Sequence, residues 1–157
     1  MTGYLTAIFV SPSKHSEQIS LESAQLIAGK GITGDRFYGN RQKHTQLNLT
    51  LIEAETIEAF NRCYNETLAL SATRRNLITR NVRLNDLVDK HFYIGDVLCV
   101  GRELCEPCIV MARQISNCGL SSTDIIRFFE NKGGLRAEIL TSGIAQVGDY
   151  ITAAGIS

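Results

Sequence analysis

The chain has 157 residues, the size of one ordinary domain, and its composition of 44% hydrophobic and 20% charged residues is typical of a globular protein. Sixteen basic residues balance sixteen acidic ones, so no overall charge favours nucleic acid or an anionic membrane as a partner. No apolar run approaches the roughly 18 residues that a membrane span needs. We therefore expect a single domain over residues 1–157 that binds neither nucleic acid nor membrane.

The amino-terminal segment and the cysteine count bear on the compartment. The apolar stretch at residues 4–10 is short and no basic residue precedes it, so we expect a first strand there and not a signal peptide. Five cysteines, an odd number, argue against the disulfide framework of a secreted protein. These features predict a cytoplasmic protein whose thiols are reduced.

Two segments have the pattern of helices. Thr50 followed three residues later by Glu53 matches a capping box, which predicts a helix over residues 51–63. A second helix is expected over residues 123–132, with Ser122 as its amino-terminal cap and four apolar side chains along one face.

The remaining periodic segments are short, apolar and separated by Gly-Asp pairs, as strands joined by turns are. They cover residues 4–11, 21–28, 76–79, 91–94, 97–100, 135–140 and 143–152, and alternating leucines at 47, 49 and 51 suit another half-buried strand. Strands do not alternate regularly with helices, which disfavours a doubly wound parallel sheet. The prediction is a mainly β fold, a closed or partly closed β-barrel with two helices.

Residues 29–34 match the G-x-G-x-x-G pattern of dinucleotide-binding proteins. That pattern needs a helix directly after the glycines to hold a pyrophosphate at its amino terminus. Residues 35–41 have no helical periodicity. We therefore expect the glycines to form a tight loop, not a nucleotide site.

The segment Cys105-Glu106-Pro107-Cys108 is a C-x-x-C motif. No βαβ pattern surrounds it, as a thioredoxin-like protein would require. A zinc site would need Cys99 and Cys118 as further ligands, without a second C-x-x-C. Cys99, Cys63 and Cys118 are expected to be small core residues.

The strongest candidates for a catalytic or ligand-binding role are Pro107-Cys108 and the run Arg74-Arg75-Asn76. A proline fixes φ and ends a strand, so it presents the following thiol in a defined loop direction. That thiol is reactive only if positive charge lowers its pKa. Two guanidinium groups and an amide suit recognition of a phosphate, although a solvated strand end would carry the same residues. From the residues alone, both readings of each motif remain open.

Seven short motifs follow one another in an order typical of one family. They are GITGDR at 31–36, LTLIE at 49–53, RNLIT at 75–79, FYIGD at 92–96, EPC at 106–108, GLRAEIL at 134–140 and VGD at 147–149, with Gly143 before the last. Together they resemble the MOSC domain, the molybdenum-cofactor sulfurase C-terminal domain, from about Leu5 to Ile151. The resemblance implies a β-rich, barrel-like fold, in agreement with the periodicity.

The resemblance also implies a site. Cys108 stands in the Pro-Cys position, where the family's cysteine carries sulfur or ligates molybdenum. Arg74, Arg75 and Asn76 resemble residues that anchor the pterin and phosphate of the molybdenum cofactor, molybdopterin, with Arg36 as a further anchor. Pyridoxal phosphate is not expected, because it belongs to a desulfurase partner, and Lys30 is the one lysine worth testing for it.

Three functions agree with this pattern. The chain could be a molybdenum-dependent reductase of N-hydroxylated compounds, which would need an external electron-transfer partner. It could instead be a non-catalytic carrier that receives sulfur or cofactor from a donor protein. A metal-free thiol redox protein is the third alternative, with Cys105 as the resolving thiol for Cys108.

Overall fold

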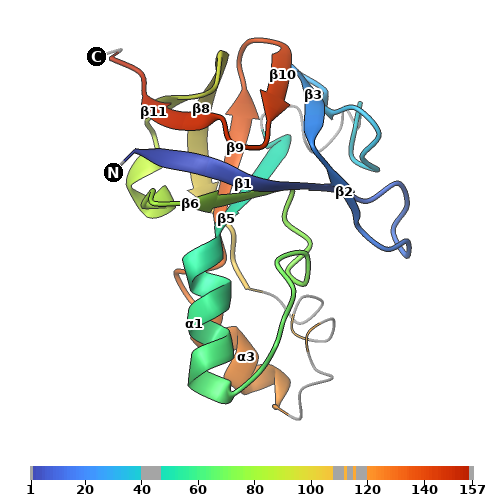
Figure 1. Cartoon of the computed structure of the whole chain (residues 1–157), viewed down its shortest axis with the longest axis vertical. Helices are drawn as coiled ribbons and strands as arrows, with labels where there is room; N and C mark the ends of the chain where they lie inside the picture. Colours follow the sequence, from blue (N-terminus) through green and yellow to red (C-terminus); the bar gives the residue numbers. More distant parts are fainter. Residues whose placement is uncertain (1, 40–46, 108–111, 113–114, 116–119, 156–157) are drawn as a thin grey trace.

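The fold consists of a β-barrel and a layer of helices, which lies below the barrel in the view of Figure 1. The structure, a computed structural model, describes residues 2–39, 47–107, 112, 115 and 120–155. Eight strands form the main sheet in the order β11-β7-β8-β9-β5-β6-β1-β2, and β1 also pairs with β11, which closes seven of them into a ring. The strands are β1 (Gly3–Val10), β2 (Ile19–Leu21), β5 (Leu49–Glu53), β6 (Leu77–Arg80), β7 (His91–Ile94), β8 (Val97–Leu104), β9 (Leu135–Ile139) and β11 (Tyr150–Ala153).

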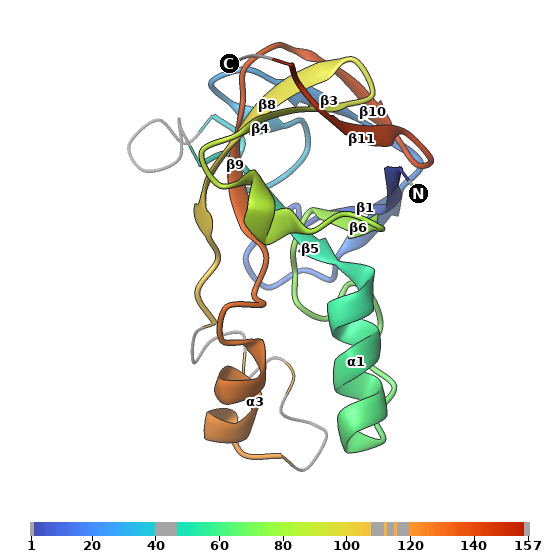
Figure 2. The same cartoon turned by 90° about the vertical axis from the view of Figure 1, so that its left-hand side faces the viewer.

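The barrel is mixed in strand direction, and a second sheet adjoins it. Strands β5 and β6 pair in parallel, whereas the other pairs of the ring are antiparallel. The smaller sheet has the order β10-β3-β4 and consists of β10 (Gly143–Gln146), β3 (Ser23–Ile27) and β4 (Gly31–Ile32). Figure 2 shows the second sheet beside the upper part of the barrel, away from the helices. The predicted mainly β fold with a barrel and two helices is confirmed.

Successive side chains of a β-strand point to opposite faces, so neighbouring residues of one strand pack into two different cores. In β6, Leu77 packs inside the barrel with Leu51 and Leu135, whereas Ile78 packs outside it against the helices. All four side chains are fully buried. The barrel wall therefore has an apolar face on both sides where the helices cover it.

The helical layer consists of α1 (Ala54–Tyr64) and α3 (Ser122–Phe129). Phe60 of α1 lies at the centre of an aromatic group, with its ring centroid 5.2 Å from that of Phe128 and 5.5 Å from that of Phe129. Ala112 and Ile115 are buried in the same cluster. A short 3₁₀ helix, η1 (Leu84–Leu87), packs against β5, β8 and β9 and places Leu84 in the barrel core.

The predicted starts of both helices are wrong. Thr50 lies in β5, where its hydroxyl bonds to Asn76, and Glu53 precedes α1 without a side-chain capping bond. The cap of α3 is Ser121, whose Oγ accepts from the Asp124 amide at 3.1 Å, and not Ser122. Tertiary pairing of β5 with β6 and β9 thus overrides the local capping pattern.

Two predicted strands are each divided in the structure. The segment 21–28 is divided between β2 and β3, and 143–152 between β10 and β11. In both cases the two parts belong to different sheets, so the chain crosses from one sheet to the other. Residues 29–34 form a tight loop as expected: β3 and β4 pair across it, and Gly29, Gly31 and Gly34 all have positive φ. Residues 33–39 contain no helix.

No helix in the described ranges is long and apolar enough to cross a bilayer.

Candidate functional site

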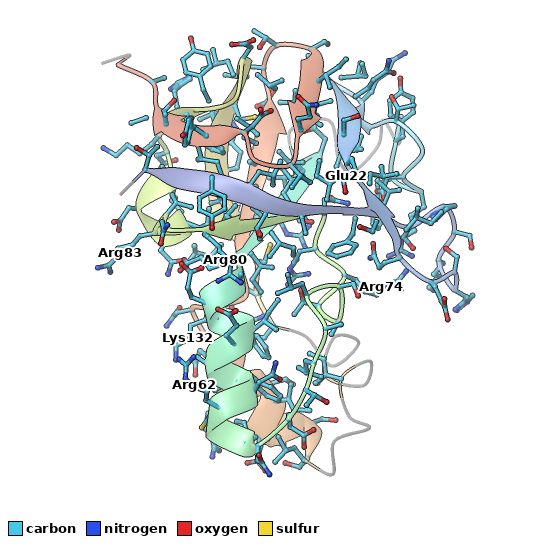
Figure 3. All side chains as sticks on the ribbon, in the orientation of Figure 1. Glu22, Arg62, Arg74, Arg80, Arg83 and Lys132 are labelled. Carbon is cyan, nitrogen blue, oxygen red and sulfur yellow. The ribbon has the colours of Figure 1, made fainter. Side chains whose placement is uncertain are left out.

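Arg74 lies on the segment that leads from α1 into β6. Its backbone has a left-handed conformation, with φ of 59°. Its Nη1 donates to the Ser16 carbonyl oxygen at 3.1 Å, and its Nη2 donates to the hydroxyl of Ser11. Figure 3 shows Arg74 on the other side of α1 from Arg83 and Lys132. The guanidinium group is therefore fixed against the loop that follows β1.

Ser11 connects Arg74 to the Gly-Asp-Arg motif. The Ser11 amide donates to Asp35 Oδ1 at 2.9 Å, and the Ser11 carbonyl accepts from the Arg36 amide at 2.8 Å. The side chain and backbone of Ser11 thus bond to two motifs that lie far apart in the sequence. Ser11 is 4% exposed. No motif in the sequence singles it out.

Arg36, predicted as a further anchor, is exposed at the surface. Its guanidinium carbon lies 4.3 Å from the centroid of the Phe37 ring, which is a cation–π arrangement. Its backbone, not its side chain, makes the bond to Ser11. Lys30 is likewise exposed, with its ammonium 6.0 Å from the centroid of the Tyr38 ring.

Asn76 joins three strands at the point where β6 begins. Its Oδ1 accepts from the Thr50 amide at 3.3 Å and from the Thr50 hydroxyl at 3.1 Å, and its Nδ2 donates to the Phe9 carbonyl at 3.2 Å. Its own amide donates to Thr50 Oγ1 at 3.0 Å, and its carbonyl accepts from the Phe9 amide at 2.7 Å. The side chain therefore fastens β6 to β1 and β5, and thereby fixes the position of Arg74 and Arg75.

We expect Asn76→Ala to lower the free energy of unfolding by about 1–3 kcal/mol, because partners on β1 and β5 lose their hydrogen bonds. Urea unfolding followed by circular dichroism measures this. The control is Asn85→Ala, since the Asn85 amide also donates to a backbone carbonyl, that of Asn131 at 2.8 Å, but the residue is exposed. We expect a change within about 0.5 kcal/mol for the control. Equal losses in both variants would contradict a role for Asn76 in joining the strands.

Arg75 points to a different place from Arg74. Its Nε donates to the Gly133 carbonyl at 2.9 Å. The adjacent Gly134 carbonyl accepts from the Cys105 amide at 2.8 Å, and a Cβ on Gly133 would overlap the Cys105 carbonyl oxygen. The structure therefore brings Arg75 to the start of the C-x-x-C segment. The Gly133-Gly134 pair makes this approach possible, and that doublet is the feature by which the sequence could have indicated it.

The Cys105 thiol is 1% exposed. Burial raises its pKa; the positive charges of Arg75 and Arg136 oppose this, whereas Glu103 and Glu106 add to it. A buried thiol with a raised pKa is a poor nucleophile, because the thiolate is the reactive form. These properties disfavour Cys105 as a resolving thiol.

The other cysteines differ from one another. Cys108, the predicted catalytic and metal-binding residue, lies outside the described residues, as does Cys118. Cys99 faces the barrel interior as expected, and burial raises its pKa to about 12. Cys63 was expected in the core, but it is exposed on α1. The exposed face of α1 carries it because Ile57 and Phe60 occupy the buried face.

A polar pocket of about 320 Å³ lies between the start of α1, η1 and the segment after α3. Its lining consists of Glu53, Thr56, Arg83, Asn85, Asn131 and Lys132. Glu53 Oε2 accepts from the Leu84 amide at 3.2 Å, and burial raises the pKa of this carboxyl above its ordinary value of 4.5. The bond from the Leu84 amide and the charge of Arg83 lower that pKa, whereas the charges of Glu55 and Asp86 raise it further. No motif in the sequence indicates this pocket.

The raised pKa of Glu53 predicts a pH-dependent contribution to stability. A carboxyl with a raised pKa in the folded state binds its proton more tightly there than in the unfolded chain. Its favourable contribution is complete below the unfolded value near 4.5 and is lost as the pH rises through the folded pKa. We expect Glu53→Gln, which keeps an oxygen for the Leu84 amide, to raise the melting temperature at pH 7 more than at pH 4. A constant difference between pH 4 and pH 7 would contradict this expectation.

A family profile and several solved structures resemble this chain. The profile described as MOSC domain matches residues 35–152. The YUAD protein from Bacillus subtilis superposes with a TM-score of 0.84 at 13% identity, covering 100% of this chain and 98% of that one. YiiM from Escherichia coli gives 0.74 at 16% identity, covering 100% and 71%. YiiM from Geobacillus stearothermophilus gives 0.74 at 12% identity, covering 97% and 75%. At these identities the structures share the fold; no curated protein matches the sequence.

Proposed function

The chain belongs to the MOSC domain family, and from this we propose that it binds molybdenum cofactor, with Cys108 as molybdenum ligand or sulfur carrier. The family is associated with this cofactor. One observation carries the proposal for this chain. Arg75 is bonded to Gly133 beside Cys105, so cationic residues and the first residues of the C-x-x-C segment are neighbours in space. Cys108 follows three residues later in the sequence.

The chemistry of the residues fits such a group. A guanidinium group has five N–H donors, and the bonds to Ser11 and Ser16 leave Arg74 further donors for a phosphate. Next to it in the sequence, the Thr73 hydroxyl is buried and has no hydrogen-bond partner among the described residues, and the same is true of Gln18 Oε1. Buried polar atoms are seldom left without a partner. The remaining donors of Arg74 therefore suit the anionic part of a ligand, and the Thr73 hydroxyl, next to it in the sequence, is a further candidate donor.

Each residue has a distinct part in this proposal. Arg74 binds the phosphate-bearing end, Arg75 provides positive charge beside the C-x-x-C segment, and Arg36 adds positive charge at the surface. Asn76 positions the two arginines through its bonds to β1 and β5. When bound, the cofactor supplies a metal centre that a soft thiolate can ligate. Cys108 provides that thiolate, or holds the sulfur that a donor protein delivers.

Two versions of this function differ in what the protein does with the cofactor. In the first, it is a reductase of N-hydroxylated compounds that receives electrons from an external partner. In the second, it is a non-catalytic carrier of sulfur or cofactor for a partner enzyme. The metal-free thiol redox protein has less support, because the Cys105 thiol is buried and its pKa is raised.

The test is metal and pterin analysis of protein expressed in cells that make the cofactor. We expect molybdenum and pterin fluorescence in the wild type and in Cys63→Ala, whose cysteine is exposed on α1. Cys108→Ala is expected to lose the molybdenum. Equal molybdenum in Cys108→Ala and wild type would refute the ligand assignment. Turnover of a hydroxylamine with a chemical reductant then separates the reductase from the carrier.

A further inference from the structure

We propose that Ser11 is a positioning residue for the anion-binding half of the site, holding Arg74 and the Asp35-Arg36 turn in one arrangement. This inference rests on the proposed function, because it assigns Ser11 a role in cofactor binding through Arg74. Ser11 itself need not touch the ligand. It lies before residue 35, where the family profile begins to match.

The hydrogen bonds of Ser11 carry the inference. Its amide donates to Asp35 Oδ1 at 2.9 Å and its carbonyl accepts from the Arg36 amide at 2.8 Å. Its hydroxyl donates to the Ser13 carbonyl at 2.8 Å and accepts from Nη2 of Arg74. All three polar groups of this buried serine are thus engaged, and they connect three separate segments.

Each connected segment is in a defined conformation. Pro12 fixes φ directly after Ser11. Asp35 also accepts from the Phe37 amide through Oδ2 at 3.4 Å, so its carboxylate holds the turn that carries Arg36. Arg74 has positive φ, which costs a non-glycine residue free energy and persists only where surrounding contacts enforce it. The bonds to Ser11 and Ser16 are such contacts.

This arrangement gives Ser11 a function beyond packing. A free arginine side chain loses rotamer entropy when it binds an anion, and fixing the guanidinium beforehand removes part of that cost. Without the Ser11 hydroxyl, the Arg74 guanidinium keeps, among the described residues, the bond to the Ser16 carbonyl. The phosphate-binding guanidinium would then be less well oriented, although its charge is unchanged.

The test compares Ser11→Ala, Arg74→Ala and the double variant by the rate at which molybdenum leaves the purified holoprotein during dialysis. Loss of an orienting partner typically weakens a site 10–100-fold. We expect Ser11→Ala to lose molybdenum about 10-fold faster than wild type. The double variant should lose it no faster than Arg74→Ala, because Ser11 acts through Arg74. Ser11→Thr, which keeps the hydroxyl, should restore the wild-type rate.

The control is Ser13→Ala, since Ser13 is exposed and bonds through its backbone. Its rate should equal that of wild type. Melting temperatures of the apoproteins show whether a faster rate reflects loss of folding. Wild-type rates in Arg74→Ala would refute the proposed anchoring by Arg74 itself. A faster rate in Arg74→Ala with no change in Ser11→Ala, or additive effects in the double variant, would refute the role of Ser11 alone.

Discussion

Replacing Gly134 by alanine is expected to lower the free energy of unfolding by about 2–6 kcal/mol. Gly134 has φ of 107°, and an added Cβ would overlap the Leu51 carbonyl oxygen on β5. The cost has two parts, backbone strain of about 1–3 kcal/mol and steric overlap of about 1–3 kcal/mol. The overlap lies where Leu135 pairs with Leu51, so relief requires β5 and β9 to separate. Urea unfolding measures the loss.

Alanine substitutions at two other glycines measure backbone strain and steric overlap separately. Gly148 has φ of 97° with no atom within 4 Å of an added Cβ, so Gly148→Ala measures strain without overlap. Gly101 has no such positive φ, but a Cβ there would overlap the Leu87 carbonyl oxygen, so Gly101→Ala measures overlap without strain. We expect Gly134→Ala to be the most destabilising of the three. A loss in Gly134→Ala no larger than in Gly148→Ala would show that β5 and β9 separate at little cost.

The second large effect is expected from Phe60→Ala in α1. The Phe60 side chain is fully buried between the barrel wall and α3 and contacts the rings of Phe128, Phe129 and Tyr64. Removing it leaves a cavity, and such substitutions cost about 3–5 kcal/mol. Phe60→Leu keeps most of the volume and should cost less than about 1.5 kcal/mol. Chemical denaturation of both variants measures the difference.

Loss of the Phe60 ring is also expected to affect the proposed molybdenum site, in addition to the stability of the fold. Ala112 and Ile115 follow the predicted ligand Cys108 by four and seven residues in the sequence, and they pack in the same cluster as Phe60. We therefore expect Phe60→Ala to reduce molybdenum content as well, whereas Phe60→Leu should retain it. A variant that unfolds at much lower urea concentration but keeps full molybdenum content would show that the site does not depend on the helical layer.

The fold could be predicted where side-chain alternation shows which face is buried. Leucines 49 and 51 indicated a strand correctly, because both face the barrel interior. The carboxyl-terminal half of β8 was missed, since Arg102 and Glu103 interrupt the apolar pattern and pairing with β9 extends the strand past an irregularity there. The local apolar pattern of one strand does not show which other strand will pair with it.

For the candidate site, the sequence pattern names residues but does not show how they are arranged. Arg74 and Arg75 are adjacent in sequence, and the interpretation grouped them as one anchor. In the structure, Arg74 contacts the loop after β1 and Arg75 contacts Gly133, because the irregular backbone at Arg74 directs the two side chains differently. The resemblance predicts Asn76 as a ligand contact, and in the structure its side-chain amide bonds to Thr50 and Phe9. Such tertiary contacts leave no local pattern.

The closure of the barrel has a consequence for how the protein folds during synthesis. Strands β1 and β11 meet at only two register pairs, Gly3 with Ile151 and Tyr4 with Tyr150. These residues come from opposite ends of the chain, which Figure 1 shows side by side. Contacts between residues so far apart in sequence form slowly. A ribosome-bound chain therefore exposes β1 without this neighbour until β11 has emerged, and the ring closes only after synthesis has passed the last strand.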